Sequence, residues 1–476
     1  MVRSLWLGGA GACALALLAI GCPAVADGLC ARNVCDDDAG ASGDINTPDV
    51  VPTDPCIENP TAPECLEEDS AIFVSPGGDD TGGEGSKARP FKTIVKGLSA
   101  IDGQRKRIYA CTGTYSDEIR LNATHNGVSI FGGLDCSWNP TADRPRIEGS
   151  ANPIRVEGTL GLAIAGVEVR ATDSTDGSSI GMFISGGDTT LSRVRIEAGA
   201  GANGSPGTLE PVTQPTPAAL AGQPADAGIG AAARIVQCPA GGGTTGGAGG
   251  DNGFPGKKGE PDLGGGAGGE GGNCSEGIGK DGNPANPGKN GSGAKVIGTL
   301  MPTGWIPASG ENGAAGPPGQ GGGGGLGRLG GGGGGGGAGG CGGAAGGGGK
   351  GGGASIAIAA LEARLTLRNS ELKTGKAGNG GAGVAGQSGQ ASGGLGGVQS
   401  PGGCQGGNGA AGGSGGAGGG GAGGISVGVL YKGTLEPQID PATQAAILLG
   451  EHGAHGQGAS QNDGVDGQSA AMLMAP

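Results

Sequence analysis

The stretch that decides the fold is Ser179-Ile-Gly-Met-Phe-Ile-Ser185, which is followed by Thr190-Leu191 and Arg195-Ile-Glu197. Short runs of this kind, alternating apolar with polar residues, predict β-strands. The same pattern returns without a gap from Ser355-Ile356 onward, and it starts again at Ser426-Val-Gly-Val429. The repeated unit is a strand, a turn, a strand and then a Gly-Asn-rich exit.

A shorter repeat precedes the long one. Ile164 and Val169 return with the same spacing as Leu191 and Ile196. One coil of a stacked solenoid gives such a short period. We therefore expect a parallel β-helix whose inward Val, Ile and Leu residues form ladders. A β-sandwich is less consistent with the sequence, because Asn-Gly or Asp-Gly turns between matched strands are scarce.

Glycine is concentrated in the two exits. Residues 199–353 contain 61 Gly among 155 residues, and residues 375–424 contain 26 among 50, so these inserts hold 87 of the 121 Gly. Insertions at one corner leave a ladder intact. A collagen-type triple helix is not expected, because Gly-x-y runs soon lose phase. The inserts are either disordered loops or packed polyglycine-like strands. We expect disorder, since ordering Gly costs the most entropy.

The N-terminus predicts export. Arg3 precedes an apolar run from Leu5 to Ile20, which is typical of a signal peptide. Ala19-Ile-Gly-Cys22 is similar to a lipobox, which would place a lipid on Cys22, whereas Ala24-Val-Ala26 is a site for ordinary cleavage. We expect a lipoprotein of the outer membrane or cell surface, or a secreted protein, with no further apolar run long enough to span a bilayer.

Acidic residues are concentrated in residues 27–69, where twelve Asp and Glu face one Arg and the net charge is −11 of a total of −14. Five Pro and few large apolar residues predict an extended, solvated linker. Asp36-Asp-Asp38 lacks the spacing of a calcium loop and is interpreted as binding counterions loosely.

The expected organisation is a signal peptide (1–26, or 1–21 in a lipoprotein), an acidic Cys/Pro-containing linker (27–69), N-terminal coils with a cap (70–198), a glycine-rich insert (199–353), one coil (354–374), a second insert (375–424), and the last coil with a C-terminal tail (425–476).

Ten Cys are left for pairing after either cleavage, because Cys13 lies in the signal and Cys22 is removed or acylated, and an even number in an exported chain predicts disulfides. No C-x-x-C pair occurs and His is found only at 125, 452 and 455, so we expect no metal site and no cofactor. The simplest pairing joins nearest neighbours: Cys30 with Cys35, Cys56 with Cys65, Cys111 with Cys136, Cys238 with Cys274, and Cys341 with Cys404.

One segment resembles a known family. Ile72-Phe-Val-Ser-Pro-Gly-Gly-Asp-Asp80, followed by Ala88-Arg-Pro-Phe-Lys-Thr-Ile94, looks like the opening motif of bacterial pectate-lyase-like proteins, many of which are lipoproteins of unknown function. The resemblance implies an all-β, single-stranded right-handed parallel β-helix. The long glycine-rich insertions, which the repeat places at one corner, and the low aromatic content depart from the enzymes of that superfamily. It also implies an N-terminal cap with a short helix over residues 93–100. The frequent Gly-Gly-Ala triplets are similar to those of PE-PGRS surface proteins, in composition only.

Enzymes with this fold need paired carboxylates, or calcium with a basic residue. The candidates, chosen by location only, are Asp173, Asp176, Asp188, Glu197, Glu371 and Arg195. Charged residues of this kind are more often solvated surface, and a 2 % aromatic content disfavours stacking of sugars or bases.

Our leading hypothesis is a non-catalytic structural or adhesive surface protein that displays glycine-rich loops. The alternatives are a polysaccharide lyase or hydrolase-like enzyme and a self-associating extracellular matrix protein. The expected partners are a membrane through an N-terminal lipid, an extracellular polysaccharide or other copies of the chain. Nucleic acid is not expected, because a basic patch is absent.

Overall fold

The computed structural model describes residues 54–476. Three parallel sheets, which we call A, B and C, hold most of the strands, and the all-β class is confirmed. Sheet A contains β1 (Ala71–Val74), β2 (Arg107–Cys111), β5 (Ser129–Leu134), β8 (Leu162–Ala165), β11 (Asp188–Ser192), β18 (Arg364–Arg368) and β21 (Gln438–Ile439). Sheet B contains β3 (Thr114–Tyr115), β6 (Arg146–Glu148), β9 (Glu168–Arg170), β12 (Arg195–Glu197), β19 (Glu371–Lys373) and β22 (Ile447–Leu448). Sheet C contains β4 (Ile119–Leu121), β7 (Ile154–Glu157), β10 (Ser179–Ser185), β17 (Ser355–Leu361), β20 (Ser426–Lys432) and β23 (Ser469–Met474).

The register confirms both repeats. Ile180 pairs with Ile356, which pairs with Val427, so the copies of the long repeat are direct neighbours in sheet C. The shorter repeat pairs Ile164 with Leu191 in sheet A. From β2 onward the chain visits the sheets in the order A, B, C and then starts again, so each circuit adds one strand to each sheet.

Side chains from all three sheets fill one core. Val169, Ile196 and Leu372 stack along sheet B, and each is at most 1 % exposed. Such ladders arise because residues of neighbouring coils occupy the same register, so like-sized apolar side chains lie one above another. A second apolar cluster lies between the other face of sheet C and a hairpin, β15 (Gly298–Met301) and β16 (Gly304–Pro307).

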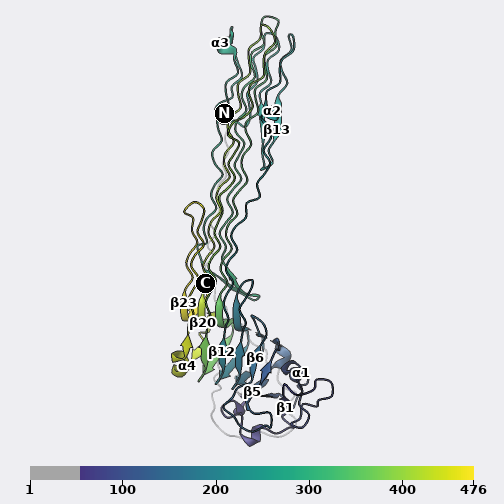
Figure 1. The fold of residues 1–476 in the computed structure, drawn as a ribbon, viewed down its shortest axis with the longest axis vertical. Helices are drawn as coiled ribbons and strands as arrows, with labels where there is room; N and C mark the ends of the chain where they lie inside the picture. The colour runs from purple at the N-terminus through teal and green to yellow at the C-terminus, as the bar shows by residue number, and fades with distance from the viewer. Residues whose placement is uncertain (1–53) are drawn as a thin grey trace, which may run out of the picture. The chain divides into compact units, whose positions relative to one another are not determined.

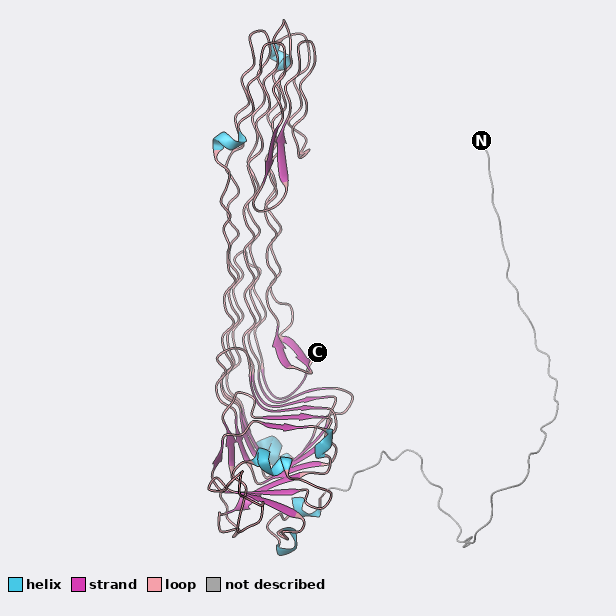
Figure 2. Ribbon diagram, turned by 90° about the vertical axis from the view of Figure 1, so that its right-hand side faces the viewer, coloured by secondary structure: helices cyan, strands magenta, loops and turns pink. Residues whose placement is uncertain are grey.

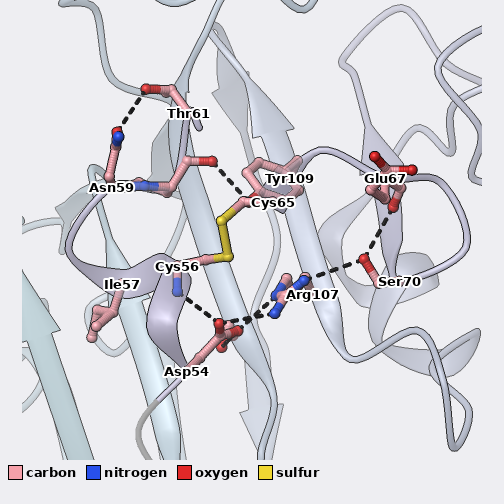
Figure 3. Close-up of a disulfide and its surroundings, with 12 residues drawn as sticks. Asp54, Cys56, Ile57, Asn59, Thr61, Cys65, Glu67, Ser70, Arg107 and Tyr109 are labelled. Atoms are coloured by element: carbon pink, nitrogen blue, oxygen red, sulfur yellow. Dashed lines mark hydrogen bonds and ion pairs between the residues drawn. A yellow bond between two sulfur atoms is a disulfide. The ribbon is translucent and has the colours of Figure 1, made fainter. Parts of the chain in front are cut away.

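The segment before β1 corrects our expectation of a solvated linker, at least for residues 54–69. Two short 3-10 helices, η1 (Pro55–Ile57) and η2 (Pro63–Cys65), are joined by the disulfide Cys56–Cys65 (Figure 3). They cover an aromatic ladder of Phe73, Tyr109 and Phe131 on sheet A. The Tyr109 hydroxyl donates to the carbonyl oxygen of Pro60 at 2.8 Å. Apolar burial and the disulfide thus order a segment whose composition predicts solvation; Cys22, Cys30, Cys35 and the Asp36–Asp38 run lie outside the described residues.

Asp54 ties this segment to the sheets. Its carboxylate accepts a hydrogen bond from the Arg107 guanidinium (Figure 3) and another from the Ser129 hydroxyl, each at 2.9 Å. Burial acts to raise the pKa of Asp54, but these hydrogen bonds and one from the Cys56 backbone N–H outweigh it, so the pKa is lowered. At the same end of the sheets, α1 (Ile94–Ser99) begins after Thr93, whose hydroxyl accepts from the Lys96 N–H. The expected capping helix is therefore present.

The inserts are ordered, contrary to our expectation. They form a bundle of long extended segments that leave the sheets and return to them, which we call the glycine bundle (Figure 1, Figure 2). Every excursion leaves after a strand of sheet B and returns to a strand of sheet C, so all insertions share one corner. The long excursion also contains α2 (Pro217–Leu220), the hairpin of β13 (Arg234–Gln237) and β14 (Gly243–Gly246), and α3 (Cys274–Gly277).

A hydrogen-bonding pattern that repeats every three residues explains why the inserts are ordered. In the segment 404–424, the N–H groups of residues 406, 409, 412, 415, 418 and 421 donate to the segment 375–400, whereas those of residues 407, 410, 413, 416, 419 and 422 donate to the segment 308–327. Carbonyls of the segment 404–424 accept from the segments 277–297 and 332–354. Three residues per turn and no internal hydrogen bonds are the properties of polyproline II. Backbone groups that a single such helix leaves unpaired are here paired between neighbours.

Glycine permits the close approach of neighbouring segments in the bundle. A Cβ atom on Gly349 would lie 1.8 Å from the Gly381 carbonyl oxygen, and one on Gly418 would lie 2.0 Å from the Gly347 carbonyl oxygen. In the outer segment 308–327, Gly310, Gly313 and Gly316 meet the segment 404–424 in the same way. An inner segment thus needs Gly at most positions, and an outer one chiefly at every third. The Gly-x-y fragments of the sequence reflect this contact rather than a triple helix.

The C-terminal region also differs from the expected tail. After α4 (Pro441–Ala445) and β22, residues 450–468 form a third, shorter excursion into the bundle, in which the Gly453 N–H donates to Gly424 O and the Gly467 N–H donates to Gly453 O. The chain then returns to sheet C as β23.

Candidate functional site

The distal end of the glycine bundle, far from the sheets, is built from five turns. Their residues are 226–230, 251–254, 273–278, 327–331 and 399–403. Hydrogen bonds join the first four: the Asn252 N–H donates to Gly228 O, the Gly330 N–H donates to Asn252 Oδ1, and the N–H of Leu326, which directly precedes the fourth turn, donates to Gly277 O. The fifth turn is held by Ser400, whose hydroxyl accepts from the Gly332 N–H at 2.7 Å. We call this set of turns the distal tip.

Large apolar side chains gather on the distal tip. Ile229, Phe254 and Leu329 are 62 %, 65 % and 74 % exposed, and Val398, just before the fifth turn, is 62 % exposed. Ile229, Phe254 and Leu329 belong to three turns that hydrogen bonds link, and Val398 directly precedes the fifth turn. Burying such side chains is favourable by about 1.5 to 3 kcal/mol each. Exposed large apolar side chains on turns that are joined to one another are a candidate interaction surface.

Two disulfides lie in the distal half of the bundle. Cys238 is joined to Cys341 and Cys274 to Cys404, so the nearest-neighbour pairing expected for these four residues is wrong. The reason is the bundle itself. Residues 231–238 run beside the segment 332–354, as shown by the hydrogen bond from the Ala231 N–H to Gly333 O, and this neighbour carries Cys341. The expected pairs Cys56–Cys65 and Cys111–Cys136 are confirmed.

The outward face of sheet B carries alternating charges. Glu148, Arg170, Glu197 and Lys373 are successive partners across β6, β9, β12 and β19. A parallel column runs through Arg146, Glu168, Arg195 and Glu371. We call these eight residues the charge grid.

Glu197 lies at the centre of the charge grid. Its carboxylate lies 2.6 Å from the Arg195 guanidinium and 3.9 Å from both the Arg170 guanidinium and the Lys373 ammonium group, and its side chain is only 12 % exposed. The hydrogen bond that Arg195 donates to Glu197 raises the pKa of Arg195, although burial opposes it. Opposite charges on paired positions stabilise the register of neighbouring strands. A groove of ≈ 590 Å³ runs beside the grid.

Of the six candidate residues, Arg195, Glu197 and Glu371 meet in the charge grid, and the others lie beside it or elsewhere. Asp173 and Glu197 line the groove beside the charge grid, but Asp173 Oδ1 accepts from the Ala200 N–H at 2.7 Å. Asp176 is exposed on a turn, and Asp188 begins β11 in sheet A, where it accepts from the Gly161 N–H. Glu371 pairs with Arg144 at 3.1 Å and belongs to the charge grid with Arg195. These carboxylates hold turns and strand partners.

The three histidines are likewise in separate turns. His125 ends η3 (Ala123–His125), where its Nδ1 accepts from the Asn122 N–H. His455 lies in the short third excursion, 2.6 Å from Asp466, whereas His452 is exposed. Within residues 54–476 no three His, Cys, Asp or Glu side chains come together in a way that could hold a metal ion. In the same part of the chain, no helix has the length and apolar character needed to cross a bilayer.

Sequence reasoning missed the distal tip. Its signal was present as single large residues such as Phe254 and Leu329 within inserts that are otherwise Gly-rich, but isolated residues do not show which turns meet.

Comparison with protein-family models, with curated proteins and with solved structures finds no match to this chain.

Proposed function

We propose that this chain is an exported, non-catalytic adhesive protein in which the sheets form a base and the glycine bundle holds the distal tip away from it. The base is a single-stranded right-handed parallel β-helix of the pectate-lyase-like kind. The observation that carries the proposal is the set of exposed side chains on the distal tip, Ile229, Phe254, Leu329 and Val398. An apolar contact surface at the end of a long support is suited to adhesion.

The bundle has the properties of a rigid support. The segment 404–424 contains 21 residues and spans about 65 Å at ~3.1 Å per residue. Its backbone groups bond to neighbouring segments along this length, and the disulfides Cys238–Cys341 and Cys274–Cys404 limit separation of the distal segments. A flexible Gly-rich chain would instead coil up, because its length grows only with the square root of residue number.

Export is supported by the four disulfides of the described residues, which are typical of oxidising compartments. We propose that the chain is anchored at the outer membrane or cell surface by a lipid on Cys22, with residues 27–53 as the tether. The base would then lie near the surface and the distal tip would face outward.

The test measures adhesion directly. The full mature chain is attached through its N-terminus to microspheres, and their retention under flow is measured on alkyl-coated and on hydroxyl-coated glass. We expect at least tenfold greater retention on the alkyl surface. The quadruple variant Ile229→Ser, Phe254→Ser, Leu329→Ser, Val398→Ser should lose this preference, because it removes the exposed apolar side chains of the distal tip.

A matched control changes exposed apolar residues near the sheets. Val296, Met301 and Ile306 are 52 %, 43 % and 51 % exposed at or beside the β15–β16 hairpin. Their triple Ser variant should adhere like the unmodified chain. Equal retention of the distal-tip variant and the unmodified chain, with both folded, would contradict the proposal.

A further inference from the structure

The last strand of sheet C has one free edge. β23 pairs with β20, and no strand among residues 54–476 pairs with its other side. Its sequence, Ser469-Ala-Ala-Met-Leu-Met474, has no charge and no proline. Sheets A and B end beside it in strands of only two residues, β21 and β22. β23 therefore exposes a row of backbone donors and acceptors over its whole length.

Within the described residues, β23 itself lacks the devices that protect edges. Natural edge strands are shortened, carry charges or proline, or are covered by another element. At the opposite end, α1 packs on the core, and residues 85–91 cover the edge of β1 through hydrogen bonds from the Phe73 N–H to Gly85 O and from the Phe91 N–H to Phe73 O. At the β23 end, Leu448 and Met474 are each 63 % exposed and Leu435 is 49 % exposed. An uncovered edge flanked by exposed apolar side chains indicates a binding surface.

We propose that the free edge of β23 binds the same edge of a second copy of this chain, in antiparallel orientation. The two-fold axis passes between Ala471 and Met472. A two-fold axis requires antiparallel pairing of identical strands, because each residue then meets its partner reciprocally. The interface is separate from the distal tip, so the inference stands independently of the proposed function.

The strand sequence argues for a second copy as the partner. Its first three residues are small and its last three include only large apolar ones. In the proposed register Ser469 faces Met474, Ala470 faces Leu473 and Ala471 faces Met472 across the axis. The alternation of β23 is interrupted at Ala471, which has no partner in β20, so Ala470 and Leu473 lie on the same face of sheet C, beside Val427 and Leu430. Each small side chain thus lies opposite a large one, which is the arrangement that fills space between paired strands. The strand is its own complement.

The interface is small. One short strand pair with a few flanking side chains falls below the ~1,200 Å² that stable complexes bury. We therefore expect a concentration-dependent dimer of the full mature chain, with a dissociation constant in the micromolar range or weaker. Sedimentation velocity over a hundredfold concentration series measures it.

A cysteine pair tests the register. In the variant Ser469→Cys, Met474→Cys, each new Cys faces the other one across the axis, where opposite Cα atoms are about 4.5 to 5.5 Å apart, within disulfide reach. Within one chain the two positions are about 17 Å apart and cannot bond. Mild oxidation should give a covalent dimer. Each single Cys variant should give little, because identical positions are equally far apart across the axis.

Charge variants provide a second measurement on the same positions. Ser469→Lys, Met474→Lys should weaken dimerisation at least tenfold, as should Ser469→Glu, Met474→Glu, because like charges then oppose each other twice. Mixing the two variants should restore a heterodimer.

The variants are compared only when their thermal unfolding matches that of the unmodified chain. Efficient cross-linking of a single Cys variant, unchanged association of the Lys variant, or a chain that stays monomeric at every concentration would each overturn the proposal.

Discussion

The base and the glycine bundle both bury a backbone hydrogen-bond network, but they fill their interiors in opposite ways. In the base, Ile, Val and Leu side chains such as Ile196 and Ile358 point inward and occupy the space between three sheets. In the bundle, the centre consists of backbone, as at Gly349 and Gly418, where carbonyl oxygens of neighbouring segments occupy the place of a side chain.

This difference teaches that glycine can serve as a core residue. A hydrophobic core gains stability from apolar area removed from water, whereas the bundle has few apolar side chains and relies on paired backbone groups, close contact and cross-links. The base should therefore be sensitive to the removal of atoms, and the bundle to their addition. The following changes test this contrast in order of expected effect.

Loss of the bundle disulfides should have the largest effect. The bridges Cys238–Cys341 and Cys274–Cys404 close loops of 103 and 130 residues. Replacing both cysteines of either bridge by Ser should lower the free energy of unfolding by about 4 to 5 kcal/mol, since the unfolded chain gains loop entropy. Calorimetry of the oxidised chains measures this. Replacement of Cys56 and Cys65, which are close together in the sequence, should cost less.

Truncation of a buried side chain in the base should have the second largest effect on stability. Ile358 is fully buried and paired with Met182 and Val429. Ile358→Ala should lower the free energy of unfolding by about 3 to 4 kcal/mol through lost burial and a cavity. Denaturant titration measures this. The exposed Val398→Ala should change it by under about 0.5 kcal/mol; equal effects at the two sites would contradict a ladder core.

Addition of a methyl group in the bundle should also destabilise. Gly349→Ala places Cβ against the Gly381 carbonyl oxygen, and the segments must separate, at a cost of about 2 to 3 kcal/mol. Hydrogen exchange of the bundle amides should rise while that of the sheet amides stays constant. Gly272→Ala is the matched control, because its Cβ would meet no atom within 4 Å. Similar behaviour of the two variants would disprove close packing of the bundle.

The smallest effect concerns Asp54. Its pKa is lowered in the folded chain, so its contribution to stability is present above the pKa of the unfolded chain, about 3.9, and is lost as the pH falls through the lower folded value. Asp54→Asn should lower the unfolding temperature at pH 7 by an amount equivalent to about 1 to 2 kcal/mol. The difference between variant and unmodified chain should shrink below pH 4. A difference that is independent of pH would contradict this role of the carboxylate.

Much of the base could be predicted, because local periodicity reports it. The alternation at Ser179–Ser185 and its return at Ser355 defined strands, pairing and the shared corner, and the register confirms them. The order of the inserts could not be predicted, because the entropy cost of glycine is a local property, whereas the hydrogen bonds that offset it join segments far apart in the chain, such as Gly201 to Lys376.

The predictions for the two bundle disulfides and for the functional site failed for the same reason. Cys238 and Cys341 become neighbours only after several segments are laid side by side, so sequence distance misled the pairing. The acidic candidates were chosen by location along the chain, and the structure distributes them between turns and the charge grid. The distal tip depends on turns far apart in sequence and has no local pattern.

The sequence by itself determined the repeating coil, the all-β class and the corner from which the glycine segments leave, because period and register are carried by neighbouring residues. Only the tertiary structure decided that these segments pack into an ordered bundle, which cysteines meet, and which apolar side chains share the distal tip. The physical reason is that a glycine backbone carries no side chain to encode its neighbour. Its partners are chosen when whole segments align and satisfy their hydrogen bonds together.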